Sequence, residues 1–282
     1  MKMLLVPVDF SPAACNAFEY ALRVSHPFKS RVTVLYVYQP PMAEPFAEFA
    51  LQAELYTQEE ALARERFERM VHDLPPALVQ ERQIEFQMEV GFSALEIQRV
   101  AQELMPDLIV MGMRGGSPFA KKILGSTTTS LLQRTAAPIL VVPEHATYEG
   151  LKHIAYATDY EEDDIRVIDE VLYFARKNQA RLTCLHVNTA AEEKNTYKQE
   201  LFRRAYATEI AQDSIAFRTL QDDSVVDGVM DFAQEAHVGM IVMLTHPRTR
   251  IGQIFQYSHA REAARVTPVP LWVYPMYEKT PA

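Results

Sequence analysis

Residues 106–143 read PDLIVMGMRGGSPFAKKILGSTTTSLLQRTAAPILVVP. The stretch opens with a short apolar run, passes through a glycine-containing loop and a run of hydroxyl residues, and closes with a second apolar run. Short apolar runs bounded by turn residues are typical of buried strands. Strands separated by a helix pair in parallel through a right-handed crossover, so this order predicts a strand–loop–helix–strand unit.

The same arrangement occurs a second time in the chain. Residues 238–275 read VGMIVMLTHPRTRIGQIFQYSHAREAARVTPVPLWVYP, which aligns with the first stretch at an offset of 132 residues without a gap. The openings also match, since residues 5–10 read LVPVDF and residues 155–160 read AYATDY. Self-similarity over this length predicts a duplicated domain.

We expect the two domains at residues 1–145 and 151–282, joined by a short polar linker near Glu144–Gly150. In the first copy, apolar runs alternate with segments of helical composition. The expected strands are Met3–Val8, Arg31–Tyr38, Ile84–Val90, Leu108–Met111 and Ile139–Val142, and the expected helices are Ala13–Ser25, a helix within residues 44–73, and Ser93–Leu104. This predicts an α/β fold of two open, parallel, five-stranded sheets with helices on both faces. Such sheets bind ligands at the carboxyl ends of their strands.

Composition sets limits on the function. The 282 residues are 48% apolar and carry a formal net charge of −9, with acidic and basic residues interspersed. A nucleic-acid surface would show a basic stripe, so no nucleic-acid partner is expected. An anionic ligand remains compatible with an acidic chain, because a local group of backbone N–H donors can hold phosphate.

No membrane partner is expected either, and we expect a cytoplasmic protein. The first apolar run is only as long as a strand and ends at Asp9, and no stretch approaches the roughly 18 apolar residues of a membrane span. The two cysteines, Cys15 and Cys184, show no spacing pattern and are expected to be small packing residues.

The residues suited to chemistry gather after the fourth expected strand. The chain reads Gly112-Met113-Arg114-Gly115, then nine residues, then Gly125-Ser126-Thr127-Thr128. Glycines allow a backbone to turn sharply and to approach a ligand that a Cβ would exclude. The first N–H groups of the helix after Gly125 have no intrahelical acceptor, and they suit phosphate together with the helix dipole. Ser126 and Thr127 add hydroxyl donors.

Parts of this pattern also have ordinary explanations. A glycine–two residues–glycine pattern is common by itself, and threonines at a helix start are frequent caps. What favours a phosphate site is the context: an apolar strand, a glycine turn, a nine-residue loop, a glycine-hydroxyl helix start and a closing Pro-apolar strand.

In these features the chain resembles the universal stress protein family, in a tandem two-domain form. Nucleotide-binding members of that family carry glycine, two residues, glycine, nine residues, then glycine followed by serine or threonine, and residues 112–126 match this pattern. The opening residues 6–11 (VPVDFS) and closing residues 138–143 (PILVVP) also resemble it. The resemblance covers essentially the whole chain. It implies a Rossmann-like nucleotide-binding fold, a stress-response role, and ATP, ADP or AMP as ligand, with or without Mg²⁺.

The resemblance also assigns roles to individual residues. It implies that Asp9 and the backbone of Pro7 and Val8 meet the adenine and ribose side, and that the backbone of Val37 contacts adenine. It places residues 112–115 along the ribose and first phosphates, where Met113 and Arg114 lie between the two glycines. It assigns the distal phosphates to Ser126, Thr127 and Thr128, next to Gly125.

Two groups of charged residues have alternative explanations. A turn or cap carboxylate is the alternative explanation of Asp9, because the second copy keeps Asp159 while losing the rest of the pattern. Arg114, Lys121 and Lys122 could screen a triphosphate, or they could be solvated surface residues.

The second copy has lost the glycine pattern. At the offset of 132, Gly112 becomes Leu244, Gly115 becomes Pro247 and Gly125 becomes Tyr257, while Ser126 keeps its type as Ser258. Bulk and a proline stand where the backbone should approach phosphate. Four acids at residues 161–164 are expected to start the first helix of this copy, where they favour its positive end but would oppose a polyphosphate. We therefore expect one nucleotide per chain, in the first domain. Three histidines of this copy show no close metal-ligand spacing and are expected to be ordinary surface or packing residues: His153, His246 and His259.

The last strand of each copy is an apolar edge, at Ile139–Val142 and Leu271–Tyr274. The family resemblance implies that such edges pair between domains as in a dimer, so the two halves are expected to form a pseudo-dimer within one chain. Whether two chains form a homodimer is left open.

Three functions stay open at this point. The leading one is a nucleotide-binding stress or regulatory protein. A slow ATPase or self-phosphorylating enzyme is the second, although no acid lies within residues 112–129 to hold a metal or position a nucleophile. A scaffold that binds no nucleotide is the third.

Overall fold

The computed structural model describes residues 1–40, 49–113, 126–189, 196–245, 263 and 267–275. The first half contains β1 (Met3–Val8), α1 (Pro12–Val24), a short 3₁₀ helix (His26–Phe28), β2 (Arg31–Tyr38), α2 (Phe49–His72), α3 (Pro76–Val79), β3 (Ile84–Val90), α4 (Ser93–Leu104), β4 (Leu108–Met113), α5 (Ser126–Arg134) and β5 (Ile139–Pro143). The second half contains β6 (His153–Ala157), α6 (Glu162–Lys177), β7 (Arg181–Asn188), α7 (Thr196–Ala205), α8 (Ala207–Ala211), β8 (Ile215–Gln221), α9 (Val225–Glu235), β9 (Met240–Thr245) and β10 (Leu271–Pro275).

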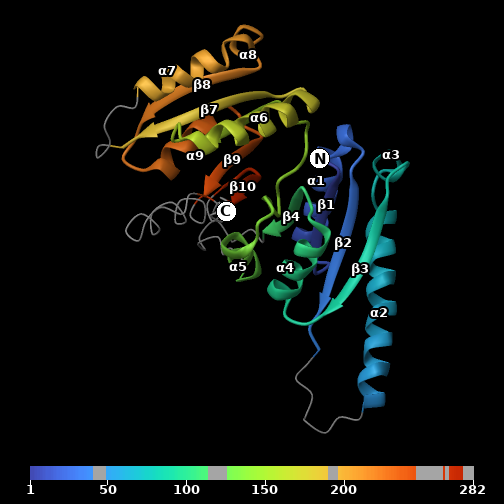
Figure 1. Cartoon of the computed structure of the whole chain (residues 1–282). Helices are drawn as coiled ribbons and strands as arrows, with labels where there is room; N and C mark the ends of the chain where they lie inside the picture. Colours follow the sequence, from blue (N-terminus) through green and yellow to red (C-terminus); the bar gives the residue numbers. More distant parts are fainter. Residues whose placement is uncertain (41–48, 114–125, 190–195, 246–262, 264–266, 276–282) are drawn as a thin grey trace.

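The strands form one ten-stranded sheet in the order β3-β2-β1-β4-β5-β10-β9-β6-β7-β8 (Figure 1). Within each half the five strands are parallel, as predicted. The two halves meet where β10 runs antiparallel to β5, with Trp272 opposite Leu140. The order reverses between β1 and β4 in the first half and between β6 and β9 in the second. These two points are where an open α/β sheet binds its ligands.

Helices cover both faces of the sheet, and each face has its own apolar core. One core contains side chains of α1, α2, α6 and α7, and the other contains side chains of α4, α5 and α9. Successive side chains of a strand point to opposite faces of the sheet. The fully buried residues Leu4 and Leu5 of β1 show this, since Leu4 belongs to the first core and Leu5 to the second. Strands buried on both faces are apolar along their whole length, which explains the uninterrupted apolar runs in the sequence.

The helix α1 begins at Pro12, one residue before the predicted start. The Ser11 hydroxyl accepts a hydrogen bond from the Ala14 N–H at 3.3 Å, and Pro12 occupies the first turn. Serine at this position stabilises the helix by satisfying an N–H that has no intrahelical partner. The helix ends at Val24, one residue before the predicted end.

The duplication is also visible in the backbone. Phe10 and Tyr160, each directly after the aspartate that follows the first strand of its half, both have positive φ, at 58° and 57°. Met105 follows α4 directly and His237 lies two residues after the end of α9, in the segment before the fourth strand of each half, and their φ values are 46° and 51°. Non-glycine residues rarely adopt this conformation, so its recurrence reflects a shared backbone path.

Two further findings concern the helices and the cysteines. Among the described residues, no helix is long and apolar enough to cross a membrane. Cys184 is buried and Cys15 is half-buried, and burial raises the pKa of both thiols.

Candidate functional site

The candidate site of the first half lies at the carboxyl edge of the sheet, where the strand order reverses. β1 and β4 are hydrogen-bonded neighbours, and their carboxyl ends are Val8 and Met113. Pro7 pairs with Leu35 in β2, and Val8 pairs with the next residue of that strand. The half-buried Val37 follows directly along β2. The structure therefore brings the predicted strand residues to a single edge.

Asp9 is exposed at this edge, and its Oδ1 accepts a hydrogen bond from the Ser11 N–H at 3.0 Å. This is the geometry of an aspartate that stabilises its own turn. The hydrogen bond supports the turn interpretation, and the contact of Asp9 with a nucleotide stays a prediction.

An aromatic pair beside Asp9 was missed in the sequence. The Phe10 ring lies 5.2 Å from the Tyr36 ring, and the Arg66 guanidinium of α2 lies over Phe10 at 6.0 Å. The Tyr36 hydroxyl donates to Glu59 of α2 at 2.9 Å. Burial is the larger cause and this hydrogen bond the next of the rise in the pKa of Tyr36 to about 12. The sequence did hold a signal for this pair, because each copy has an aromatic residue directly after its aspartate. Phe10 follows Asp9, and Tyr160 follows Asp159.

The turn predicted at Gly112 is wrong, while the contact of this residue with a nucleotide stays a prediction. Gly112 lies inside β4, which continues to Met113 instead of ending at Met111, and it pairs with Val142. A Cβ on Gly112 would lie 2.4 Å from the carbonyl oxygen of Ala13. The missing side chain therefore admits the first turn of α1, a steric reason that applies with or without a ligand.

This packing predicts a stability defect. We expect Gly112→Ala to destabilise the protein by about 1–3 kcal/mol, because backbone atoms of Ala13 cannot move aside as a side chain would. The matched control is Gly239→Ala, whose Cβ would lie 3.2 Å from the end of the Leu151 side chain. Urea denaturation measures both. Equal midpoints for the two variants would contradict the steric role of Gly112.

The remaining predicted residues divide into three groups. The Met113 side chain is buried in the core, so only its backbone lies at the edge, and its carbonyl accepts from the Glu144 N–H at 2.9 Å. Ser126 opens α5, where Thr127 is half-buried and Thr128 is 4% exposed. The third group lies outside the described residues, namely Arg114, Gly115 and Gly125, together with Lys121 and Lys122.

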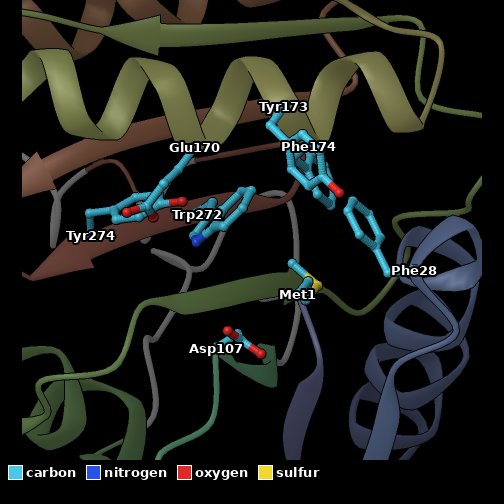
Figure 2. Close-up of a pocket in the computed structure, with 8 residues that line it drawn as sticks. All are labelled: Met1, Phe28, Asp107, Glu170, Tyr173, Phe174, Trp272 and Tyr274. Carbon is cyan, nitrogen blue, oxygen red and sulfur yellow. The ribbon is translucent and has the colours of Figure 1, made fainter.

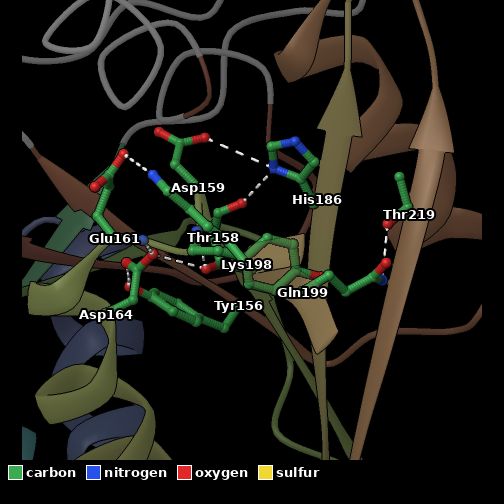
Figure 3. Close-up of polar contacts among 10 residues, drawn as sticks. Tyr156, Thr158, Asp159, Glu161, Asp164, His186, Lys198, Gln199 and Thr219 are labelled. Atoms are coloured by element: carbon green, nitrogen blue, oxygen red, sulfur yellow. Dashed lines mark hydrogen bonds and ion pairs between the residues drawn. The ribbon is translucent and has the colours of Figure 1, made fainter. Parts of the chain in front are cut away.

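The corresponding edge of the second half holds a network of polar side chains (Figure 3). The buried Asp164 carboxylate accepts hydrogen bonds from the Tyr156 hydroxyl, from the Thr158 hydroxyl at 2.7 Å and from the Glu161 N–H at 2.9 Å. The Glu161 side chain in turn accepts from the N–H of Asp164, which completes a capping box at the start of α6. Two carboxylates thus use donors at the helix end that an anionic ligand would need.

Further side chains form contacts at this edge of the second half. Lys198 of α7 pairs with Glu161 at 2.9 Å. His186 of β7 lies 2.8 Å from the Thr158 carbonyl through Nδ1, and the same atom is 3.9 Å from Asp159. The ring of the buried Tyr160 packs against His186 at 5.3 Å. The carboxylates of this edge and the His186 ring are therefore engaged with neighbouring groups of the second half.

The structure places one of the three second-half histidines. His153 lies 3.1 Å from the Ala236 carbonyl through Nδ1 and 2.8 Å from the Thr183 hydroxyl through Nε2. A carbonyl only accepts, so Nδ1 carries the proton and Nε2 accepts from Thr183. His246 and His259 lie outside the described residues, and within the described ranges no group of three His, Cys, Asp or Glu side chains could hold a metal ion.

The environment of His153 predicts a pH dependence of stability. Burial lowers the pKa of His153 below the ordinary value of 6.5. The unfolded chain therefore binds a proton more readily than the folded chain, and stability should fall as the pH drops below 6.5. We expect His153→Asn to lose less stability than the wild type between pH 7.5 and pH 5, a range from about 1 unit above to about 1.5 units below the ordinary histidine pKa. Denaturant unfolding across this range measures the difference, and identical slopes for both proteins would refute the assignment.

Known proteins share both the repeat and the fold. A model of the universal stress protein family matches residues 1–143 and again residues 150–275. The universal stress protein MJ0531 of Methanocaldococcus jannaschii is 26% identical over 147 residues, which cover 50% of this chain and 81% of that protein.

Two solved structures match the chain over nearly its whole length. A universal stress protein of Archaeoglobus fulgidus has a TM-score of 0.75 at 18% identity, covering 97% of this chain and 98% of its own. The functionally unknown protein PA1789 of Pseudomonas aeruginosa has a TM-score of 0.64 at 15% identity, covering 98% of this chain and 92% of its own. At such identities the likeness concerns the fold. The double match of the family model, which spans most of the chain, shows that this protein belongs to the universal stress protein family as a tandem repeat.

Proposed function

We propose that this universal stress protein is a cytoplasmic regulatory protein that holds one adenine nucleotide, ATP, ADP or AMP, in its first half. One observation carries the proposal. The glycine pattern of residues 112–126 begins at the carboxyl end of β4, next to β1, and ends at the first residue of α5. Phosphate would there meet the free N–H groups and the positive dipole end of a nine-residue helix.

The second half supports the restriction to one site. At its carboxyl edge the carboxylates of Asp164 and Glu161 accept the N–H donors at the start of α6. Lys198 offsets the charge of Glu161. Asp159 and Asp164, however, add further negative charge that disfavours a polyphosphate. Leu244 stands where the first half has Gly112, and its side chain packs against the apolar core.

The pairing of β5 with β10 supports a second part of the proposal. Apolar edge strands are prone to association, and here the two edges cover each other within one chain. We propose that this intramolecular pairing takes the place of a dimer contact between single-domain relatives.

Calorimetric titration of nucleotide-free protein with ATP, ADP and AMP tests the function. We expect saturable binding together with a rise in melting temperature, because a ligand that binds only the folded state stabilises it. If ATP, ADP and AMP gave neither heat nor a thermal shift, the remaining function would be that of a scaffold that binds no nucleotide. Hydrolysis at about 1 per second or faster would instead indicate an enzyme of the phosphoryl-transfer class.

A further inference from the structure

A pocket of about 240 Å³ lies between the two halves, away from the candidate nucleotide site (Figure 2). Its lining includes Met1, which precedes β1, and Asp107, which precedes β4. Both residues lie at the amino ends of parallel strands, so the pocket opens at the edge of the first-half sheet opposite to the carboxyl edge described above. The second half contributes residues of α6 and β10.

The floor of the pocket is aromatic. Phe174, Trp272 and Tyr274 are each at most 3% exposed. The Phe174 and Trp272 rings meet edge to face at 4.9 Å, and the Trp272 and Tyr274 rings stack at 5.0 Å. Phe28 of the first half stacks on Phe174 at 5.7 Å, so the aromatic lining comes from both halves.

One polar atom of this floor lacks a partner. The Trp272 Nε1 is buried and has no hydrogen-bond partner among the described residues. Figure 2 shows the indole nitrogen on the edge of the ring that faces Asp107. A buried N–H donor without an acceptor is costly, and a ligand acceptor in the pocket would remove that cost.

The rim of the pocket is acidic. The Oδ2 atom of Asp107 accepts from the N–H groups of Lys2 and Met3, at 2.6 and 2.9 Å. Glu170 of α6 pairs with Arg166 at 3.0 Å and accepts a hydrogen bond from the Tyr274 hydroxyl. Among the described residues that line the pocket, none is a lysine, an arginine or a histidine. The described part of the lining therefore carries two carboxylates and one positive group, the amino terminus of Met1. Glu170 is already paired with Arg166, whereas Asp107 forms no ion pair with a side chain of the described residues.

We propose that this pocket binds a small organic ammonium ion that carries a hydroxyl or carbonyl acceptor. Aromatic faces attract cations, and the attraction is strongest for tryptophan. At the rim, Asp107 favours the same sign of charge, and the acceptor would receive the Trp272 N–H. A volume of 240 Å³ suits a ligand well below drug size. Since Phe28 and Phe174 belong to different halves, such a ligand would contact both.

Choline is a suitable probe, because it combines a quaternary ammonium with a hydroxyl. Trp272 is the only tryptophan of the chain, so its fluorescence reports directly on the floor of the pocket. We expect saturable quenching or a spectral shift with choline, and calorimetric heat with the same midpoint. The uncharged analogue in which carbon replaces the choline nitrogen should not saturate the signal. Equal responses to both compounds, or no saturable response to choline up to tens of millimolar, would refute the proposal.

Variants of α6 locate the site. We expect Glu170→Gln to weaken choline binding about 3- to 10-fold, the range of an ionic contact at a partly exposed rim. The matched control Glu162→Gln removes an exposed carboxylate of the same helix that does not line the pocket, and it should leave the midpoint unchanged. Equal weakening by both variants would indicate a general effect of net charge and would overturn the assignment. Both variants should titrate normally with ATP, which separates this site from the proposed nucleotide site.

Discussion

Replacing Gly125 with tyrosine should raise the Kd for adenine nucleotide by at least about 100-fold, an energy of roughly 2.7 kcal/mol. Gly125 lies outside the described residues, but it directly precedes α5, whose first N–H groups are the proposed phosphate donors. A tyrosine side chain would occupy the space that the phosphate needs. Two charge-assisted hydrogen bonds lost at this position account for an effect of this size. Calorimetric titration with ATP measures it.

The second half provides the matched control. Tyr257 occupies the position that corresponds to Gly125, so Tyr257→Gly makes the reverse change at the degenerate edge. We expect this variant to bind one nucleotide with wild-type affinity, because the carboxylate network around Asp164 remains in place. If Gly125→Tyr stayed folded by circular dichroism and bound ATP within a few-fold of the wild type, the loop would not be the phosphate site.

Replacing Asp164 with alanine should cost about 3–5 kcal/mol of unfolding free energy. The carboxylate is 1% exposed and accepts from two side-chain hydroxyls and one backbone N–H. Its removal leaves these three donors in an apolar environment and breaks the capping box of α6. Most domains have a total stability of only 5–15 kcal/mol, so a loss of this size is a large fraction of it.

The neighbouring Asp163→Ala is the control for Asp164→Ala. Asp163 is an exposed acid in the same first turn, where it contributes through the helix dipole alone, about 0.3–1 kcal/mol. Urea denaturation of both variants, followed by far-ultraviolet circular dichroism, gives the comparison. Similar midpoints for the two variants would show that the network around Asp164 does not stabilise the fold.

The sequence predicted the framework of the fold because its signals are local. Apolar runs between turn residues located the strands of the first half, and the end of β4 is the informative difference. Gly112 was interpreted as the turn after the strand, yet the strand continues through it. The approach of Ala13, from a helix almost 100 residues earlier in the chain, explains why this strand position holds a glycine, and no local pattern records such a contact.

The candidate sites likewise combine local features that the sequence predicted with tertiary contacts that it did not. The acids of residues 161–164 were correctly placed at a helix start, since charge near a helix end depends on nearby sequence. That Asp164 is buried between Tyr156 and Thr158 was not predictable, because it depends on how α6 packs on β6. The aromatic floor between the halves was missed for a similar reason. Phe28 and Phe174 come together only through the tertiary structure.

The most direct test of the account is a crystal structure of the full chain grown with excess ATP. We expect one nucleotide per chain, with its phosphates at the start of α5 and its base and ribose between the carboxyl ends of β1, β2 and β4. An empty first-half edge, or a nucleotide bound at the edge that holds Asp159 and Asp164, would contradict the central claim.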